Sequence, residues 1–171
     1  MRVLQISNLL ALFTALFFLG ACASVKTTEG DADSGSSATI AGVDSVDGVY
    51  VGSDTVKELA TGVPDRVFFA YDSYSVTTRG LVTLQKQAKW MEANSSFTVI
   101  VQGHCDERGT REYNLALGER RANSAKDYVV GYGIDPSRIS TISYGKERPV
   151  ATASSEGAWM KNRRAVTVQV N

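Results

Sequence analysis

The hydrophobic positions of this chain divide it into three stretches. Residues 9–20 are almost continuously apolar. Residues 23–62 are rich in Ser, Gly, Thr, Asp and Ala and show no sustained apolar period. From residue 63 onward, apolar residues recur in short runs or at helical spacing. Short apolar runs are typical of strands, and a repeat of three to four residues is typical of amphipathic helices. The pattern therefore predicts one folded domain over 63–171.

Three segments of the predicted domain are expected to be helical. The first begins after Thr77 or Thr78, either of which can cap it, and runs to about Ala93. The second runs from about Glu112 to Val130 and is ended by two glycines. A third, short helix is expected near 155–161. The apolar positions of the first helix that are expected to face the core are Leu81, Leu84, Ala88 and Met91.

Four apolar runs predict strands, at 66–70, 97–103, 138–145 and 163–170. Three adjacent apolar residues in the second run, Val99 to Val101, predict a strand that is buried on both faces. The order of elements is β-α-β-α-β-(α)-β, and strands joined by helices imply parallel pairs with right-handed crossovers. The predicted fold class is therefore α/β, in the broad sense that includes α+β.

Residues 1–21 have the features of a bacterial signal peptide. A positive start at Arg2 precedes the apolar core, which is shorter than the ~20 residues that a membrane-spanning helix needs. The core ends in Leu19-Gly20-Ala21-Cys22, which resembles the cleavage box of lipoproteins. Cleavage there would make Cys22 the lipidated first residue, and more than one acyl chain at ~0.8 kcal/mol per methylene anchors stably. The alternative is an ordinary signal peptide with a chance cysteine.

Charge is unevenly distributed, although the net charge is zero. Residues 23–65 carry a net charge of −6, and residues 66–171 carry +5. We interpret 22–62 as a lipidated N-terminus with a flexible acidic linker, in which only the less polar segment 43–52 could form a transient strand. A basic domain suits nucleic acid or an anionic polymer such as a cell wall, and the export signal argues against nucleic acid.

The candidate functional residues lie between Gly103 and Ala122, in the sequence GHCDERGTREYNLALGERRA. Asp106 follows a predicted strand, and Asn114, Leu117 and Arg121 are spaced to share one face of the next helix. A carboxylate and a guanidinium placed in this way can hold a ligand that carries an ammonium and a carboxylate close together. The alternative is that Asp106 and Arg121 pair with each other or cap helices.

These residues resemble the OmpA-like peptidoglycan-binding family, whose Asn-x-x-Leu-x-x-x-Arg-Ala pattern is met by Asn114, Leu117, Arg121 and Ala122. Three further segments are similar to its peptidoglycan-associated lipoprotein branch: VFFAYDSYSV (67–76), SYGKERPVA (143–151) and AWMKNRRAV (158–166). The resemblance covers residues 66–171. One departure is Cys105, where the family usually has a small residue such as Ala or Thr.

The resemblance implies a mixed four-stranded sheet with helices packed on one face. It also implies that Asp106 and Arg121 bind the diaminopimelate of peptidoglycan stem peptides. Asp72 and Arg108 resemble positions near the ligand, although either could be a solvated charge. Asn114 could touch the ligand or orient the loop. The expected walls of the site are Leu117, Phe69 and Tyr71, and one of Arg163 and Arg164 could line it.

The branch further implies a periplasm-facing outer-membrane lipoprotein, with Ala23 after the lipidated cysteine favouring that membrane. Its expected partners are peptidoglycan, TolB and the Tol complex, in cell division and envelope integrity.

A different wall-binding lipoprotein outside the Tol system is the first alternative. A periplasmic hydrolase using His104 or Cys105 is the second, and it is disfavoured because adjacent strand residues point apart. The single histidine and the absence of a ligand cluster predict no metal, no cofactor and no catalysis.

Overall fold

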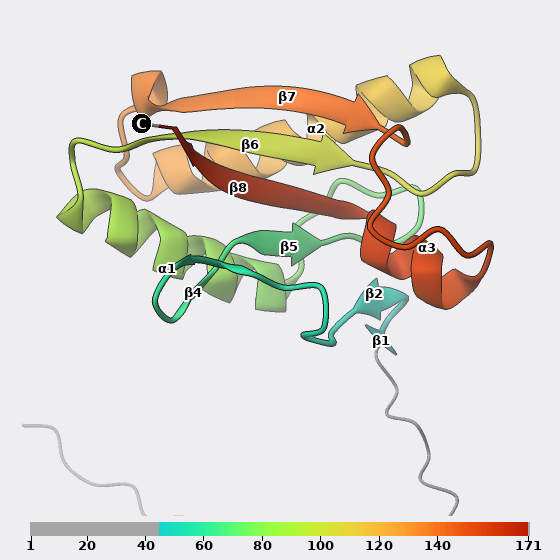
Figure 1. The fold of residues 1–171 in the computed structure, drawn as a ribbon. Helices are drawn as coiled ribbons and strands as arrows, with labels where there is room; N and C mark the ends of the chain where they lie inside the picture. Colours follow the sequence, from blue (N-terminus) through green and yellow to red (C-terminus); the bar gives the residue numbers. More distant parts are fainter. Residues whose placement is uncertain (1–44, 171) are drawn as a thin grey trace, which may run out of the picture. The chain divides into compact units, whose positions relative to one another are not determined.

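The computed structural model describes residues 45–170, so the predicted signal peptide, Cys22 and the first half of the predicted linker lie outside the described residues. Four strands form a mixed sheet in the order β5-β8-β6-β7. Strand β6 pairs in parallel with β7 and antiparallel with β8, which also pairs antiparallel with β5. The predicted mixed four-stranded sheet is confirmed (Figure 1). The strands are β5 (Arg66–Phe68), β6 (Thr98–His104), β7 (Ile139–Gly145) and β8 (Arg164–Val170).

The helices begin where the sequence supplies a hydroxyl cap. Their bounds are α1 (Thr78–Ala93), α2 (Arg111–Gly131), the 3₁₀ turn η1 (Pro136–Arg138) and α3 (Glu156–Asn162). Each helix has a cap whose side chain accepts a hydrogen bond from a backbone N–H of the first turn: Thr77 for α1, Thr110 for α2 and Ser155 for α3. None of these helices has the combination of length and apolar character needed to cross a membrane.

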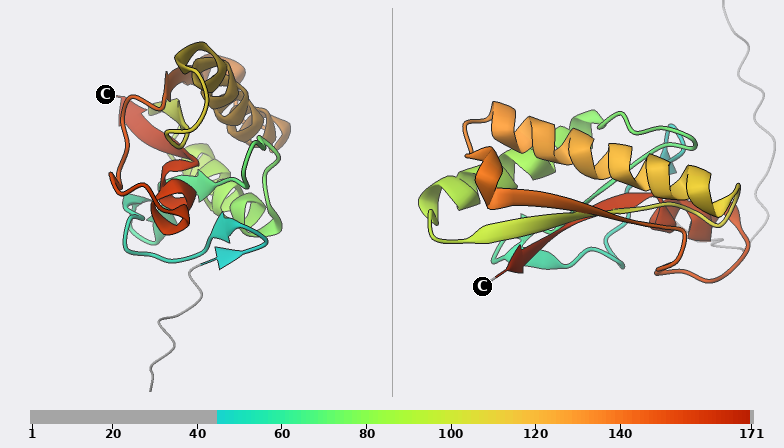
Figure 2. Two further views of the ribbon diagram at one scale, coloured as in Figure 1. Left: turned by 90° about the vertical axis from the view of Figure 1, so that its right-hand side faces the viewer. Right: turned by 90° about the horizontal axis from the view of Figure 1, so that it is seen from above.

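Both long helices cover the same face of the sheet (Figure 2), and the main core lies between these helices and the sheet. Helix α2 approaches β6 so closely that a Cβ built on Gly103 would lie only 1.8 Å from the carbonyl oxygen of Gly118. This contact fixes the first half of α2 over the end of β6, where the candidate residues lie. Leu81, predicted to be a core residue, is only half-buried. The side chains at the centre of the core are Val67, Phe69, Leu84, Ala88, Met91, Val99, Val101, Ala122, Ala125, Val129, Ile134, Ile139 and Ala165.

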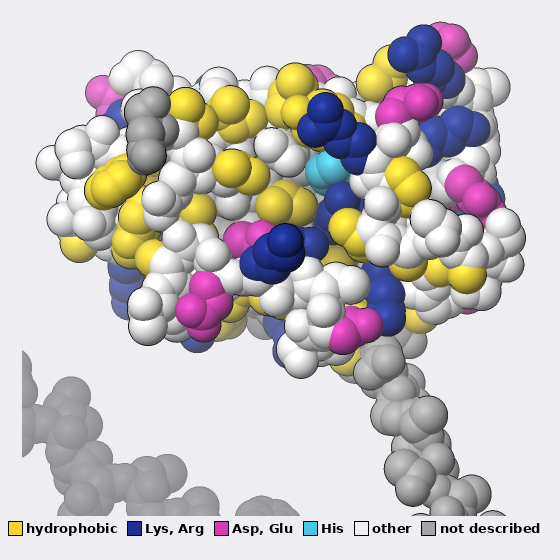
Figure 3. Space-filling view, viewed as in Figure 1, with side chains coloured by type: hydrophobic (Ala, Val, Ile, Leu, Met, Phe, Trp, Pro, Cys, Tyr) yellow, Lys and Arg dark blue, Asp and Glu magenta, His cyan; other side chains and the backbone are white. Residues whose placement is uncertain are grey.

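Neither α1 nor α2 covers the opposite face of the sheet (Figure 2). The prediction that β6 is buried on both faces is therefore wrong. Val99 and Val101 are buried, but Ile100 on the other face is only partly buried. Hydrophobic side chains of this face, among them Val168 and Val170, reach the surface (Figure 3). The physical reason is that both crossovers place their helices on one side, which leaves the second face to solvent.

Residues 45–64, which we call the N-terminal strap, fold against the domain. The prediction of a flexible linker up to residue 62 is therefore wrong for 45–62. Asp47 and Gly48 have φ of 52° and 71° and form the two-residue turn of a hairpin. After this turn Tyr50, only 2% exposed, packs edge-on against Phe68 with 4.9 Å between ring centroids. The strap consists of β1 (Ser45–Val46), β2 (Val49–Tyr50), β3 (Glu58–Ala60) and β4 (Val63–Pro64).

Candidate functional site

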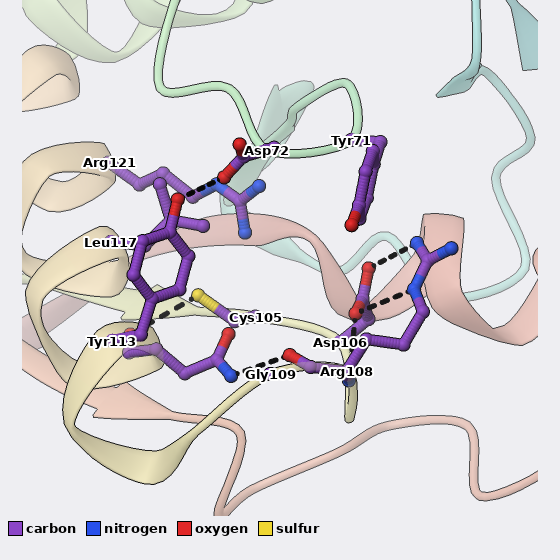
Figure 4. Close-up of a pocket in the computed structure, with 10 residues that line it drawn as sticks. Tyr71, Asp72, Cys105, Asp106, Arg108, Gly109, Tyr113, Leu117 and Arg121 are labelled. Carbon is purple, nitrogen blue, oxygen red and sulfur yellow. Dashed lines mark hydrogen bonds and ion pairs between the residues drawn. The ribbon is translucent and has the colours of Figure 1, made fainter.

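A cavity of about 200 Å³ lies at the carboxyl end of β6, between the loop after β5 and the first half of α2 (Figure 4). All six residues selected from the sequence line this cavity: Asp72, Asp106, Arg108, Asn114, Leu117 and Arg121. The remaining lining residues are Tyr71, Cys105, Gly109 and Tyr113. The fold thus brings two acids and two arginines to one hollow.

Asn114 holds the loop that connects β6 to α2. Its amide nitrogen donates hydrogen bonds to the carbonyl oxygens of Arg108 (2.7 Å) and Thr110 (2.9 Å). The loop turns at Gly109, whose φ is +87°. Of the two roles considered for Asn114, the structure therefore supports orientation of the loop, and the side chain is 2% exposed.

Asp106 is buried and its carboxylate is fully engaged by arginine. Oδ1 accepts from the backbone N–H of Arg108 and from its Nε, both at 3.1 Å. Oδ2 accepts from Arg108 Nη2 at 2.7 Å and from Arg163 Nη1 at 3.3 Å. Burial by itself would raise the pKa of Asp106, but the hydrogen bonds from Arg108 and Arg163 outweigh it and hold that pKa below its ordinary value. The carboxylate is consequently ionised.

Arg121 is also buried, but its hydrogen-bond partners are backbone oxygens. Nε donates to the carbonyl of Ser73 (2.8 Å), Nη1 to that of His104 (2.9 Å) and Nη2 to that of Ala70 (3.2 Å). The alternative that Asp106 and Arg121 simply pair is therefore not what the described residues show. A guanidinium has five N–H donors, so two remain beyond these three bonds. Arg121 fixes the loop after β5 and still presents charge to the cavity.

Arg108 lies between two aromatic rings beside Asp106. Its guanidinium carbon is 4.2 Å from the centroid of Tyr71 and 4.1 Å from that of Trp159. Its Nη1 lies 3.6 Å from a carboxylate oxygen of Glu156. Sequence reasoning missed Glu156 and Trp159 as site residues, because α3 reaches the site from about 50 positions further along the chain. The segment AWMKNRRAV (158–166) contains Trp159, whereas Glu156 lies just before it and has no signal in the sequence.

Of the two arginines at the start of the last strand, Arg163 reaches the site and Arg164 does not. Arg163 is 1% exposed and lies behind Asp106 rather than in the cavity wall. Arg164 donates to the carbonyl oxygens of Asn162 and Arg148 instead. The structure therefore selects Arg163 as the second cation on Asp106.

The walls of the cavity differ in one respect from the expectation. Leu117 and Tyr71 line it, but Phe69 is fully buried in the core, with the Arg121 guanidinium 5.3 Å from its ring. Tyr113, which the sequence did not single out, donates its hydroxyl hydrogen to Asp72. Asp72 has a φ of 50°, so the loop after β5 turns sharply there.

Cys105 and His104 point to opposite sides of the sheet. The thiol of Cys105 faces the cavity and donates to the carbonyl oxygen of Asn114 at 3.3 Å, and burial raises the pKa of this thiol. The His104 ring stacks on Tyr144 at 5.4 Å between centroids. Within residues 45–170 no three His, Cys, Asp or Glu side chains are grouped so that they could hold a metal ion. The arrangement of charges suits the binding of a ligand that bears both signs.

Comparison with known proteins gives a consistent set of relatives. A sequence model described as the OmpA family matches residues 68–163. The chain is 43% identical over 153 residues to a protein of Mesorhizobium japonicum named peptidoglycan-associated lipoprotein, which covers 90% of this chain and 86% of that one. A protein of the same name from Pseudomonas putida is 37% identical over 167 residues, covering 96% and 97% of the two chains.

Solved structures show the same fold. The crystal structure of the peptidoglycan-associated lipoprotein from Burkholderia pseudomallei superposes with a TM-score of 0.61 at 39% identity, covering 62% of this chain and 90% of that one. The C-terminal domain of Helicobacter pylori MotB gives a TM-score of 0.59 at 23% identity, covering 63% and 84%. The second likeness concerns the fold alone.

Proposed function

Because this chain belongs to the OmpA family, and within it to the peptidoglycan-associated lipoproteins, we propose that its folded domain binds peptidoglycan non-covalently through the diaminopimelate of the stem peptide. One observation carries the proposal: Asp106, Arg108 and Arg121 bring both signs of charge to one cavity of about 200 Å³. Diaminopimelate offers an ammonium and a carboxylate on one carbon, which is the pattern that such a cavity can recognise.

In the proposed complex, the ligand carboxylate binds Arg121. Two N–H groups of this guanidinium are not used by the carbonyls of Ser73, His104 and Ala70, and Arg121 lines the cavity together with the apolar Leu117. A charge-assisted hydrogen bond in a partly dry site contributes about 1.5–3 kcal/mol, whereas an exposed ion pair contributes about 0–1 kcal/mol. The walls are therefore as necessary as the charge.

The ligand ammonium binds Asp106 in place of Arg108. All the favourable acceptor positions of Asp106 are occupied by Arg108 and Arg163. The side chain of Arg108 is 31% exposed, so it can move, whereas that of Arg163 is 1% exposed and stays. Once displaced, Arg108 keeps an acidic neighbour in Glu156. The exchange replaces one cation on Asp106 by another and leaves the carboxylate ionised.

The remainder of the proposal concerns the whole chain. Cys22 is the lipidated residue that anchors the protein in the outer membrane, and residues up to the strap form the connection to the periplasmic domain. Many weak contacts along a polymer hold strongly together, because linked binding sites act at high effective concentration. We assign the protein to the Tol-Pal system, with TolB as its partner in cell division, and to no catalytic reaction.

The test is co-sedimentation of the full chain, in detergent, with purified peptidoglycan. Asp106→Asn keeps the size of the side chain and removes the charge that would receive the ammonium, so it should leave the protein in the supernatant. Asp135→Asn is a matched control, because Asp135 caps the turn η1 away from the cavity. Equal pelleting of both variants and the wild type would mean non-specific adhesion and would reject the proposed site.

A pull-down with purified TolB separates the Tol assignment from that of a wall-binding lipoprotein outside the system. Retention of TolB by the wild type supports the Tol assignment. Sedimentation with peptidoglycan but no retention of TolB supports the alternative.

A further inference from the structure

Arg163 is a buried guanidinium that joins four separate parts of the domain. Its Nε donates to the carbonyl oxygen of Phe69 at 3.2 Å, and its Nη1 donates to Oδ2 of Asp106 at 3.3 Å. Its Nη2 donates both to the carbonyl oxygen of Gly48 at 2.8 Å and to a carboxylate oxygen of Glu156 at 2.9 Å. Because a guanidinium is planar and rigid, these acceptors together fix how Arg163 meets Asp106.

The Gly48 carbonyl comes from the N-terminal strap, 115 positions before Arg163. Gly48 is the second residue of the Asp47–Gly48 turn, and both have positive φ. The strap is held in place by Tyr50, which packs on Phe68 and has the Lys161 ammonium 5.3 Å from its ring centroid. The turn therefore presents its carbonyl from a docked hairpin. This hairpin lies outside the segment that the family model matches.

Asp106 and the three charged groups around it differ in how freely they can move. Arg108 and Glu156 are partly exposed, with side chains 31% and 53% accessible. Asp106 and Arg163 are 6% and 1% accessible. When a ligand displaces Arg108, Arg163 is the cation that remains on Asp106. The orientation of Asp106 in the bound state then depends on what holds Arg163.

We propose that the N-terminal strap is a positioning element of the peptidoglycan site, in which the Gly48 carbonyl holds Arg163 and Arg163 in turn orients Asp106. The inference rests on the proposed function, in which Asp106 receives the ligand ammonium. Loss of the strap contact leaves a buried N–H without its acceptor, which is unfavourable. Arg163 then turns toward Glu156 and the Phe69 carbonyl, and Asp106 loses a fixed partner. Since the chain enters the domain through this strap, the site is coupled to the segment that leads to the proposed anchor.

The chain offers a matched pair of variants for the test. Gly48 and Gly62 both have positive φ, +71° and +75°, both lie in turns of the strap, and a Cβ added at either meets nothing within 4 Å. Valine is strained at such φ, so Gly48→Val and Gly62→Val disturb their turns equally. Only the first disturbs the acceptor of Arg163. Thermal unfolding followed by circular dichroism checks that both variants fold.

The first readout is the Kd of the full chain, in detergent, for a synthetic stem peptide that contains meso-diaminopimelate. Gly48→Val should weaken binding about tenfold, as expected when a charged hydrogen bond that supports the site is lost. Gly62→Val should stay within about twofold of the wild type, which is the effect expected of a surface substitution away from the site. Tyr50→Ala, which removes the residue that docks the strap, should weaken binding in the same direction as Gly48→Val. Equal effects of the two glycine variants, or no effect of Gly48→Val, would overturn the proposal.

The second readout is the pKa of Asp106, measured by NMR of its side-chain carboxyl carbon. Release of Arg163 should raise this pKa in Gly48→Val and leave it unchanged in Gly62→Val. The titration does not require ligand, so it separates the two hypotheses. A wild type that fails to bind the peptide rejects the proposed function, while an unchanged pKa in Gly48→Val rejects the link from the strap to Asp106.

Discussion

The Nε of Arg121 donates a 2.8 Å hydrogen bond to the carbonyl oxygen of Ser73, 48 positions earlier in the chain. The arginine of the family motif is thus a structural part of the loop that carries Tyr71 and Asp72. This double role has a practical consequence, because a change at Arg121 alters the cavity and the fold together. Binding is therefore better tested at Asp106 than by charge reversal at Arg121.

We predict that Arg121→Ala destabilises the domain by about 3 kcal/mol, because one buried and two partly buried carbonyl oxygens lose their donors. Arg120→Ala, the exposed neighbour on the same helix, should change the free energy of unfolding by less than about 0.5 kcal/mol. Urea unfolding followed by circular dichroism measures both. Similar stability of the two variants would show that the carbonyl contacts of Arg121 contribute little.

Gly118→Ala is expected to destabilise the packing of α2 on the sheet by about 1–3 kcal/mol, as overpacking of a close contact does. An added Cβ would lie 2.3 Å from Oγ of Ser143 and 3.1 Å from the carbonyl oxygen of Gly103. Gly131→Ala, at the end of the same helix, meets nothing within 4 Å and should be neutral or stabilising by up to about 1 kcal/mol. Thermal melting distinguishes them, and a Gly118→Ala variant as stable as Gly131→Ala contradicts the close approach.

Acid should destabilise the domain partly through His104. Burial, followed by the charges of Arg164, Arg66 and Arg148, lowers the pKa of His104 from 6.5 to about 3. Between these values the unfolded chain binds the proton and the folded chain does not. Stability therefore falls as pH decreases through this window, by up to about 1.4 kcal/mol per pH unit.

The measurement for His104 is the free energy of unfolding from pH 7 to pH 4, compared with His104→Phe. Phenylalanine keeps a ring against Tyr144 and removes the titrating group. The slope should be shallower in the variant, and parallel curves would contradict the assignment. Carboxylates such as Asp106 lose stabilisation at low pH in both proteins, so their contribution to the slope cancels in the comparison.

Cys105 should react slowly with thiol reagents and should be dispensable for wall binding. Its thiol is 3% exposed and burial raises its pKa, so the reactive thiolate is scarce. We expect labelling at pH 8 to be at least about tenfold slower than in urea-unfolded protein, since only the thiolate reacts. Cys105→Ala should sediment with peptidoglycan like the wild type. Rapid labelling of the folded protein, or turnover of muropeptides that is lost in Cys105→Ala, would instead support the hydrolase alternative.

Local patterns in the sequence were sufficient for the helices and for much of the site. The hydroxyl cap of α1, the glycines that end α2 and the apolar spacing predict both helices nearly to the residue, because helices are stabilised by contacts between near neighbours. Asp106, Asn114, Leu117 and Arg121 could be grouped because all four lie on one continuous strand–loop–helix segment. The turn at Asp47-Gly48, between valines, is also a local hairpin signal, and it lies in the less polar segment 43–52, for which the composition predicts only a transient strand.

The tertiary structure decided which charges meet. Arg163, Glu156 and Trp159 reach Asp106 and Arg108 from the far end of the chain, and Gly48 reaches Arg163 across 115 positions. Sequence spacing carries no information about such contacts, because they depend on how α3 and the strap pack on the sheet. The sequence by itself thus determined the local elements and the motif. Packing determined that Asp106 is held by two arginines and that Arg121 is tied to backbone carbonyls.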